Sequence, residues 1–104
     1  MATLLVLFNL AEDADPTEYE QWAREVDVPT VEGLRSVDRM RVFKVGSMLG
    51  SDQAPPFRYF EVIEVNDLEK LGEEVTSEVM QPIAAKFQGE FAESPIFLIA
   101  DELA

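Results

Sequence analysis

The chain lacks both cysteine and histidine, and it carries few basic residues. Without cysteine there is no disulfide framework and no thiolate nucleophile. Without histidine the chain has no side chain that ordinarily titrates near neutral pH, and the commonest ligand of transition metals is missing. Any acid–base chemistry must therefore come from carboxylates, tyrosine, lysine or a bound ligand.

Eight lysine and arginine residues stand against 21 aspartate and glutamate residues, so the formal net charge is −13. Such a charge repels phosphate backbones and anionic lipid surfaces, and we expect neither a nucleic-acid nor a membrane partner. No apolar run approaches the roughly 18 residues of a membrane span. The N-terminal apolar run also lacks the basic region and cleavage site of a signal peptide. The sequence therefore predicts a soluble, cytoplasmic protein.

The length of 104 residues predicts one domain over residues 1–104, and 47% hydrophobic residues supply a real core. Two segments, residues 4–8 (LLVLF) and 96–100 (IFLIA), are apolar at every position. Because successive side chains of a strand point to opposite faces of its sheet, both faces of these strands must be covered. The chain has enough helix to cover one face only.

Apolar periodicity and turn residues predict the order β-α-β-β-α-β. The first helix is expected to begin after an Asp15 cap, to carry Val26 on its apolar stripe, and to stop before Pro29. A second helical region is expected in two segments with a break near Gly72 and residues 76–77. The expected strands cover residues 3–10, 37–46, 57–66 and 95–100, with a long loop over residues 46–56.

This element order is that of an α+β ferredoxin-like βαββαβ sandwich, in which a four-stranded antiparallel sheet carries two helices on one face. The other face of such a sheet is left bare. Stacking the sheets of two copies would bury that face, which predicts an isologous homodimer. A monomer would expose a patch larger than the few hundred Å² typical of monomeric proteins.

The strand order and the doubly apolar sheet resemble the dimeric α+β barrel superfamily. Residues 22–35 (WAREVDVPTVEGLR) are similar to the helix-and-turn segment of its EthD-like branch. Nearly the full length resembles the REDY-like proteins of the HapK type, through residues 7–10, 27–31, 55–59, 61–67 and 95–97. That resemblance implies a place in secondary metabolism, in a pathway like that of the tripyrrole pigment prodigiosin.

The third strand is expected at the centre of the sheet, with Tyr59, Glu61 and Ile63 on one face. A carboxylate in such an apolar setting is costly unless it is paired or neutralised. Glu61 is therefore a candidate pocket acid, unless it lies solvated near a strand end. On the opposite face, Glu64 is expected to pair with an arginine such as Arg41 or with a residue of the second copy, unless it too lies solvated near a strand end.

Asp27 stands where EthD-like enzymes place histidine, so the resemblance makes it a candidate catalytic residue. Aspartate is a base near neutral pH only if burial raises its pKa; otherwise Asp27 is a surface carboxylate in a turn. Trp22 and Tyr59 are candidate aromatic walls of a pocket between helices and sheet, although core packing also explains Trp22. Asn9 and Thr30 complete the candidate ligand-binding set.

No cofactor is expected, because the five glycines form no phosphate-binding loop and the acidic residues have no metal-site spacing. Two functions stay open. One is an accessory protein that binds a small aromatic or polyketide-like intermediate, or a biosynthetic enzyme. The other is a cofactor-independent enzyme (cyclase, decarboxylase or monooxygenase-like) that uses carboxylate acid–base chemistry. The lack of histidine and cysteine favours the first, and a raised pKa at Asp27 or Glu61 would favour the second.

Overall fold

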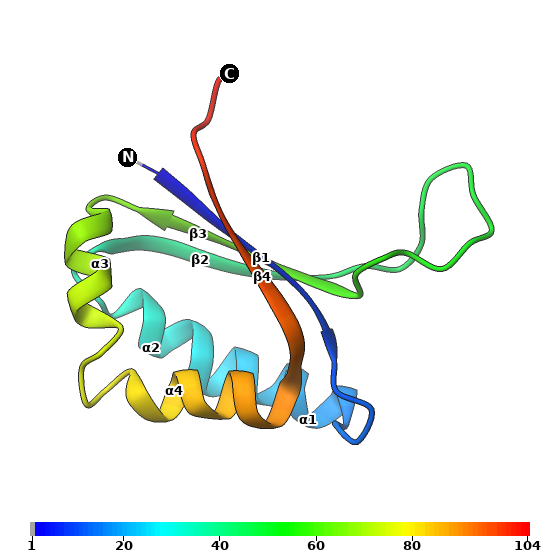
Figure 1. The fold of residues 1–104 in the computed structure, drawn as a ribbon, viewed down its shortest axis with the longest axis horizontal. Helices are drawn as coiled ribbons and strands as arrows, with labels where there is room; N and C mark the ends of the chain where they lie inside the picture. Colours follow the sequence, from blue (N-terminus) through cyan, green and yellow to red (C-terminus); the bar gives the residue numbers. More distant parts are fainter. Residues whose placement is uncertain (1) are drawn as a thin grey trace.

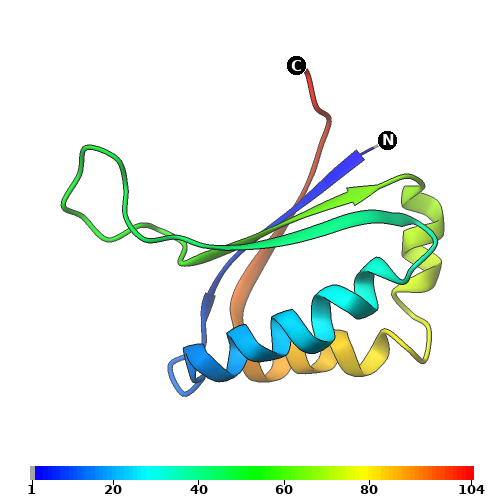
Figure 2. The same cartoon turned by 180° about the vertical axis from the view of Figure 1, so that it is seen from behind.

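The computed structural model describes residues 2–104 and shows a four-stranded antiparallel sheet with helices packed on one face (Figures 1 and 2). The strands are β1 (Ala2–Leu10), β2 (Val37–Lys44), β3 (Tyr59–Val65) and β4 (Ala92–Ala100). They lie in the order β2-β3-β1-β4, so β1 and β3 are central and β2 is an edge strand. This arrangement confirms the predicted α+β ferredoxin-like fold.

The first helical region is longer than the sequence predicted. It comprises α1 (Pro16–Trp22), the π-helical turn η1 (Ala23–Asp27) and α2 (Val28–Glu32). Asp15 caps α1 as predicted, since its side chain accepts a hydrogen bond from the Thr17 amide. The prediction that the helix stops before Pro29 is wrong. After the π-helical turn, Pro29 falls in the first turn of α2, where a missing amide hydrogen costs least.

The second helical region is broken, as predicted. It comprises α3 (Leu68–Glu74), α4 (Gln81–Lys86) and a second π-helical turn, η2 (Phe87–Phe91). Asp67 caps α3 by accepting a hydrogen bond from the Lys70 amide, and Pro82 lies in the first turn of α4. None of the helices within residues 2–104 is both long and apolar enough to cross a membrane.

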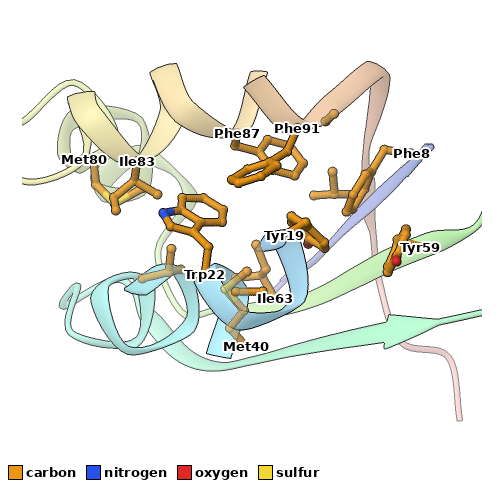
Figure 3. Packing of buried hydrophobic residues seen from close by; sticks show 14 of the residues in the cluster. Phe8, Tyr19, Trp22, Met40, Tyr59, Ile63, Met80, Ile83, Phe87 and Phe91 are labelled. Atoms are coloured by element: carbon orange, nitrogen blue, oxygen red, sulfur yellow. The ribbon is translucent and has the colours of Figure 1, made fainter. Parts of the chain in front are cut away.

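Aromatic rings hold the helices against the sheet at one end of the layer (Figure 3). Phe8 of β1 is fully buried, stacks on Tyr59 with centroids 5.6 Å apart, and meets the edges of Tyr19 and Phe87. Phe91 of η2 packs against Tyr19 at 5.3 Å. Such ring pairs add to the free energy gained by burial, so this cluster stabilises the packing of the helices on the sheet.

No helix covers the sheet face opposite the helical layer (Figures 1 and 2). Val6 and Phe8 are buried toward the helices, so the alternate residues of β1 face outward. The strand register brings together on this outer face Leu5, Leu7, Phe43, Phe60, Val62, Ile96 and Leu98. Arg41 and Glu64 form the predicted ion pair on the same face, with a closest distance of 3.8 Å.

Candidate functional site

A cavity of about 300 Å³ lies between the helices and the sheet, on the side of the core where Met80 and Ile83 lie (Figure 3). All four strands contribute to its floor, and η1, α2, α3, α4 and η2 contribute to its roof. Its polar lining residues are Asp27, Glu61 and Gln88. Its apolar lining residues are Leu4, Val6, Val31, Leu34, Met40, Ile63, Leu71, Val75, Met80, Ile83, Ala84, Phe87 and Phe97.

The π-helical turn η1 decides which residue of the first helical region faces this cavity. A helical stripe predicted Val26 as the inward residue, but Val26 is 39% exposed and Asp27 is 4% exposed. In η1 the Val28 amide bonds to the Ala23 carbonyl five residues earlier, so the turn holds one residue more than an α-helical turn. The inward position therefore moves from Val26 to Asp27, and a carboxylate enters the core where a valine was expected.

Glu61 faces the cavity because the side chains of the central strand β3 alternate between the two faces of the sheet. Its neighbours on the same face, Tyr59 and Ile63, are buried against the helices, and Glu61 is 4% exposed. The Glu61 Oε2 atom is buried and has no hydrogen-bond partner. The Tyr19 hydroxyl is also buried and makes no hydrogen bond of good geometry. It lies close enough to Glu61 to lower the pKa of that carboxyl. The cavity wall thus holds an unsatisfied acid.

The carboxyl groups of Asp27 and Glu61 both have pKa values close to neutral pH. Burial raises the pKa of Asp27 to about 7. Burial, and then the charge of Asp27, raise the pKa of Glu61 to about 8, against a small lowering by Tyr19. Because the charge of Asp27 disfavours ionisation of Glu61, the two carboxyls lose their protons in separate steps. One carboxyl can therefore give a proton while the other accepts one, which is the arrangement that acid–base chemistry requires.

The structure brings together Asp27 and Glu61 and leaves the other predicted site residues outside the cavity wall. Trp22 packs in the aromatic cluster against Tyr19 and Phe91, with centroids 6.2 and 5.2 Å apart. The predicted aromatic walls are therefore absent from the lining of the main cavity, which is mostly aliphatic.

Tyr59, Asn9 and Thr30 also lie elsewhere. The Tyr59 hydroxyl donates a hydrogen bond to Glu20 at 2.8 Å, on the far side of the aromatic cluster from the cavity. Asn9 donates to the Pro56 carbonyl and accepts from the Arg58 amide, so it anchors the loop between β2 and β3. That loop projects away from the helices (Figure 1), and none of its residues lines the cavity. Thr30 is half-buried on α2 and is not part of the lining.

Sequence reasoning missed two polar groups. One is the Tyr19 hydroxyl, which is buried and acts on Glu61, and nothing in the sequence singles it out. Gln88 lines the cavity from η2, and a second π-helical turn gives no signal in the sequence. No group of three potential metal ligands occurs within residues 2–104.

The sheet order, the single helical layer and the cavity between them define the class of α+β proteins with a ferredoxin-like fold. Within that class, the chain belongs to the family of the REDY-like protein HapK, whose family model matches residues 2–103. No curated protein matches the chain in sequence.

Three solved structures illustrate how widely this fold is shared. HapK from Hahella chejuensis is 24% identical, with a TM-score of 0.81 over 100% of this chain and 94% of that chain. An EthD family protein from Bacillus halodurans is 17% identical, with a TM-score of 0.71 over 99% of each chain. SnoaB from Streptomyces nogalater, a cofactor-independent oxygenase, is 12% identical, with a TM-score of 0.73 over 99% of this chain and 93% of that chain. At these identities the likeness establishes the fold.

The raised pKa values predict how stability depends on pH. Between pH 4.5, the ordinary pKa of a glutamate, and about 8, the unfolded chain loses the Glu61 proton that the folded chain keeps. The unfolded state then binds fewer protons, so the free energy of unfolding falls as pH rises through this window. Glu61→Gln should not lose stability in this way. Between pH 5 and 8.5 its free energy of unfolding should come to exceed that of the wild type by on the order of a few kcal/mol.

Urea unfolding followed by circular dichroism at several pH values measures this difference. The control is Glu12→Gln, which removes the same charge from an exposed position. Its stability curve should run parallel to that of the wild type. A Glu61→Gln curve that also ran parallel would show that Glu61 titrates as an ordinary surface acid.

Proposed function

We propose that this chain is a small-molecule-binding accessory protein of secondary-metabolite biosynthesis, in a pathway like that of prodigiosin-type pigments. The observation that carries the proposal is the cavity, whose long apolar wall is interrupted by a few converging polar groups. That composition is typical of small-molecule sites. Membership of the REDY-like HapK family supports the assignment to secondary metabolism.

The size of the cavity limits its ligand. A volume of about 300 Å³ is at the lower end for ligand pockets. It accommodates one or two rings of an aromatic or polyketide-like intermediate, and a larger molecule would extend past the exposed side chains of Phe97 and Val75 at the rim. The mostly aliphatic wall suits an apolar body of either kind.

A second candidate function is favoured by one specific observation. Asp27 and Glu61 share the cavity wall, and burial brings the pKa of both near neutral pH. A carboxyl pair of this kind can serve as acid and base without a cofactor. The chain would then be a cofactor-independent enzyme acting on the same intermediate, and SnoaB shows that the fold can accommodate a cofactor-independent oxygenase.

The bare outer face of the sheet supports a homodimer as the working form. Its apolar side chains lie on four adjacent strands, and Phe43, Ile96 and Leu98 are each more than a third exposed. A face of this kind on a second copy is the complement that an isologous interface requires. Packing the two faces would remove from water a patch larger than monomeric proteins normally expose.

Partly filling the cavity should weaken ligand binding. Ala84 lines the cavity from α4, and Ala84→Phe places a ring in the space the ligand needs. The matched control is Ala85→Phe, because Ala85 is exposed and outside the lining. Fluorescence titration with the uncharged probe N-phenyl-1-naphthylamine should give about tenfold weaker binding to Ala84→Phe, and unchanged binding to the control. Equal affinities for both variants would place the ligand somewhere else.

Substitution of the carboxyls separates binding from catalysis. Under the accessory function, Asp27→Asn and Glu61→Gln should change the affinity for uncharged aromatic intermediates by less than about tenfold, because the apolar wall supplies most of the contact. The wild type should also leave these intermediates unchanged when the mixture is followed by mass spectrometry. Turnover by the wild type that is lost in Glu61→Gln while binding survives would establish the enzyme instead.

An acid on the outer sheet face should break the dimer. Leu7 faces outward, so Leu7→Glu buries an unpaired charge in the interface, at a cost of several kcal/mol. Size-exclusion chromatography with light scattering should give twice the chain mass of 11.7 kDa for the wild type and the single mass for the variant. Leu49→Glu, at a fully exposed residue, should stay dimeric. A wild-type monomer at micromolar concentration would contradict the proposal.

A further inference from the structure

We propose that the cavity selects an organic cation, a molecule with an apolar body and one protonated nitrogen that is held by Asp27 and Glu61. The inference rests on the proposed function, that the cavity binds a small molecule, and it adds the chemical class of that molecule. Geometry supplies its basis, because two acids line a cavity that is otherwise almost wholly apolar.

The unpartnered oxygen of Glu61 is the first line of support. Glu61 Oε2 is buried and makes no hydrogen bond of good geometry, and the Tyr19 hydroxyl is the protein donor that acts on this carboxyl, whose side chain lines the cavity. A buried polar atom without a partner is costly, and native interiors rarely keep one unless something else satisfies it. A ligand N–H group in the cavity would supply the missing donor. An uncharged apolar ligand without an N–H group would offer Glu61 Oε2 no hydrogen bond.

The charges around the cavity are the second line of support. The titratable groups that face Glu61 are Asp27 from η1 and Tyr19 from α1, and neither is a cation. No lysine or arginine of the described residues lines the cavity. The ion pairs of residues 2–104 lie outside it and join Glu20 to Arg24 and Lys44, Arg41 to Glu64, and Lys86 to Glu90. The two cavity acids therefore have no positive partner within this part of the chain.

The alternatives to a cation fit the site less well. An anionic ligand would meet two acids inside a chain whose net charge is −13, and like charges in a poorly solvated space repel strongly. A protonated nitrogen donates a charge-assisted hydrogen bond to each carboxylate, and such bonds are roughly twice as strong as neutral ones. The selectivity should therefore follow the order cation, uncharged molecule, anion.

Proton release should accompany binding of the cation. Burial keeps the pKa of Asp27 and of Glu61 near or above neutral, so protons occupy part of the pair when the cavity is empty. A bound positive charge favours the ionised carboxylates and lowers their pKa values. The affinity for a cation should therefore rise with pH between about 6 and 8, whereas Tyr19, whose pKa is raised by burial, stays neutral throughout.

The test uses three probes that share one ring system and differ in charge: 1-naphthylmethylamine, 1-naphthylmethanol and 1-naphthoic acid. Isothermal titration calorimetry at pH 7 measures their affinities, and buffers of different ionisation enthalpy report the protons released. We expect the ammonium to bind at least about tenfold tighter than the alcohol, with the naphthoate weakest. We expect binding of the ammonium to release more than about half a proton and up to about 1.4 protons per molecule at pH 7, because both carboxyls are partly protonated in the empty cavity.

Variants assign the effect to the carboxyls. Glu61→Gln and Asp27→Asn should each lose most of the preference for the ammonium over the alcohol, and the exposed control Glu12→Gln should keep it. Thermal melts show whether the variants are folded, and the ranking of the three probes by the wild type decides the proposal even if a variant is not.

The outcomes separate this inference from the function on which it rests. Binding of the alcohol as tightly as the ammonium would overturn the preference for a cation and leave small-molecule binding intact. An unchanged preference in both folded carboxyl variants would also overturn it. Failure of all three probes to bind at millimolar concentration would contradict the cation site and the proposed function together.

Discussion

Two carboxyl groups are buried between the helices and the sheet without a cation, and they give the cavity its chemical character. Asp27 and Glu61 are each 4% exposed, and neither takes part in an ion pair among residues 2–104. Moving a carboxylate out of water is expensive, so the folded chain keeps protons that an unfolded chain would release. The pair thereby reduces stability at neutral pH. Groups that reduce stability and converge on a cavity are typical of functional sites.

The fold supports this pair with rigid elements on both sides. Glu61 lies on a central strand whose partners β1 and β2 fix its position, and Asp27 ends a π-helical turn that is held between α1 and α2. The aromatic cluster around Phe8 closes the layer at one end. The break between α3 and α4 opens it at the other, where Val75 and Met80 line the cavity. A site on strands and helices keeps its geometry better than one on loops.

Much of the fold could be predicted because it follows from local patterns. The alternation of β3, the Asp15 cap and the break in the second helical region each depend on neighbours in sequence, and each was found as predicted. The π-helical turn could not be predicted, because it uses the same residue types as an α-helix and differs only in which carbonyl each amide selects. Because of that one added residue, Asp27 rather than Val26 faces the core, and the helical region continues past Pro29.

The candidate site was predicted only in part for the same reason. A resemblance to EthD-like proteins pointed to Asp27, and strand alternation pointed to Glu61. Trp22 and Tyr59 were expected to share their pocket, yet aromatic side chains on an inward face also pack against one another, and here they did. Carbon-13 NMR of the carboxyl groups of Asp27 and Glu61 during a pH titration measures the central claim directly. We predict that the pair titrates with midpoints near 7 and 8; midpoints near 4, the ordinary range for carboxyl groups, would contradict the account.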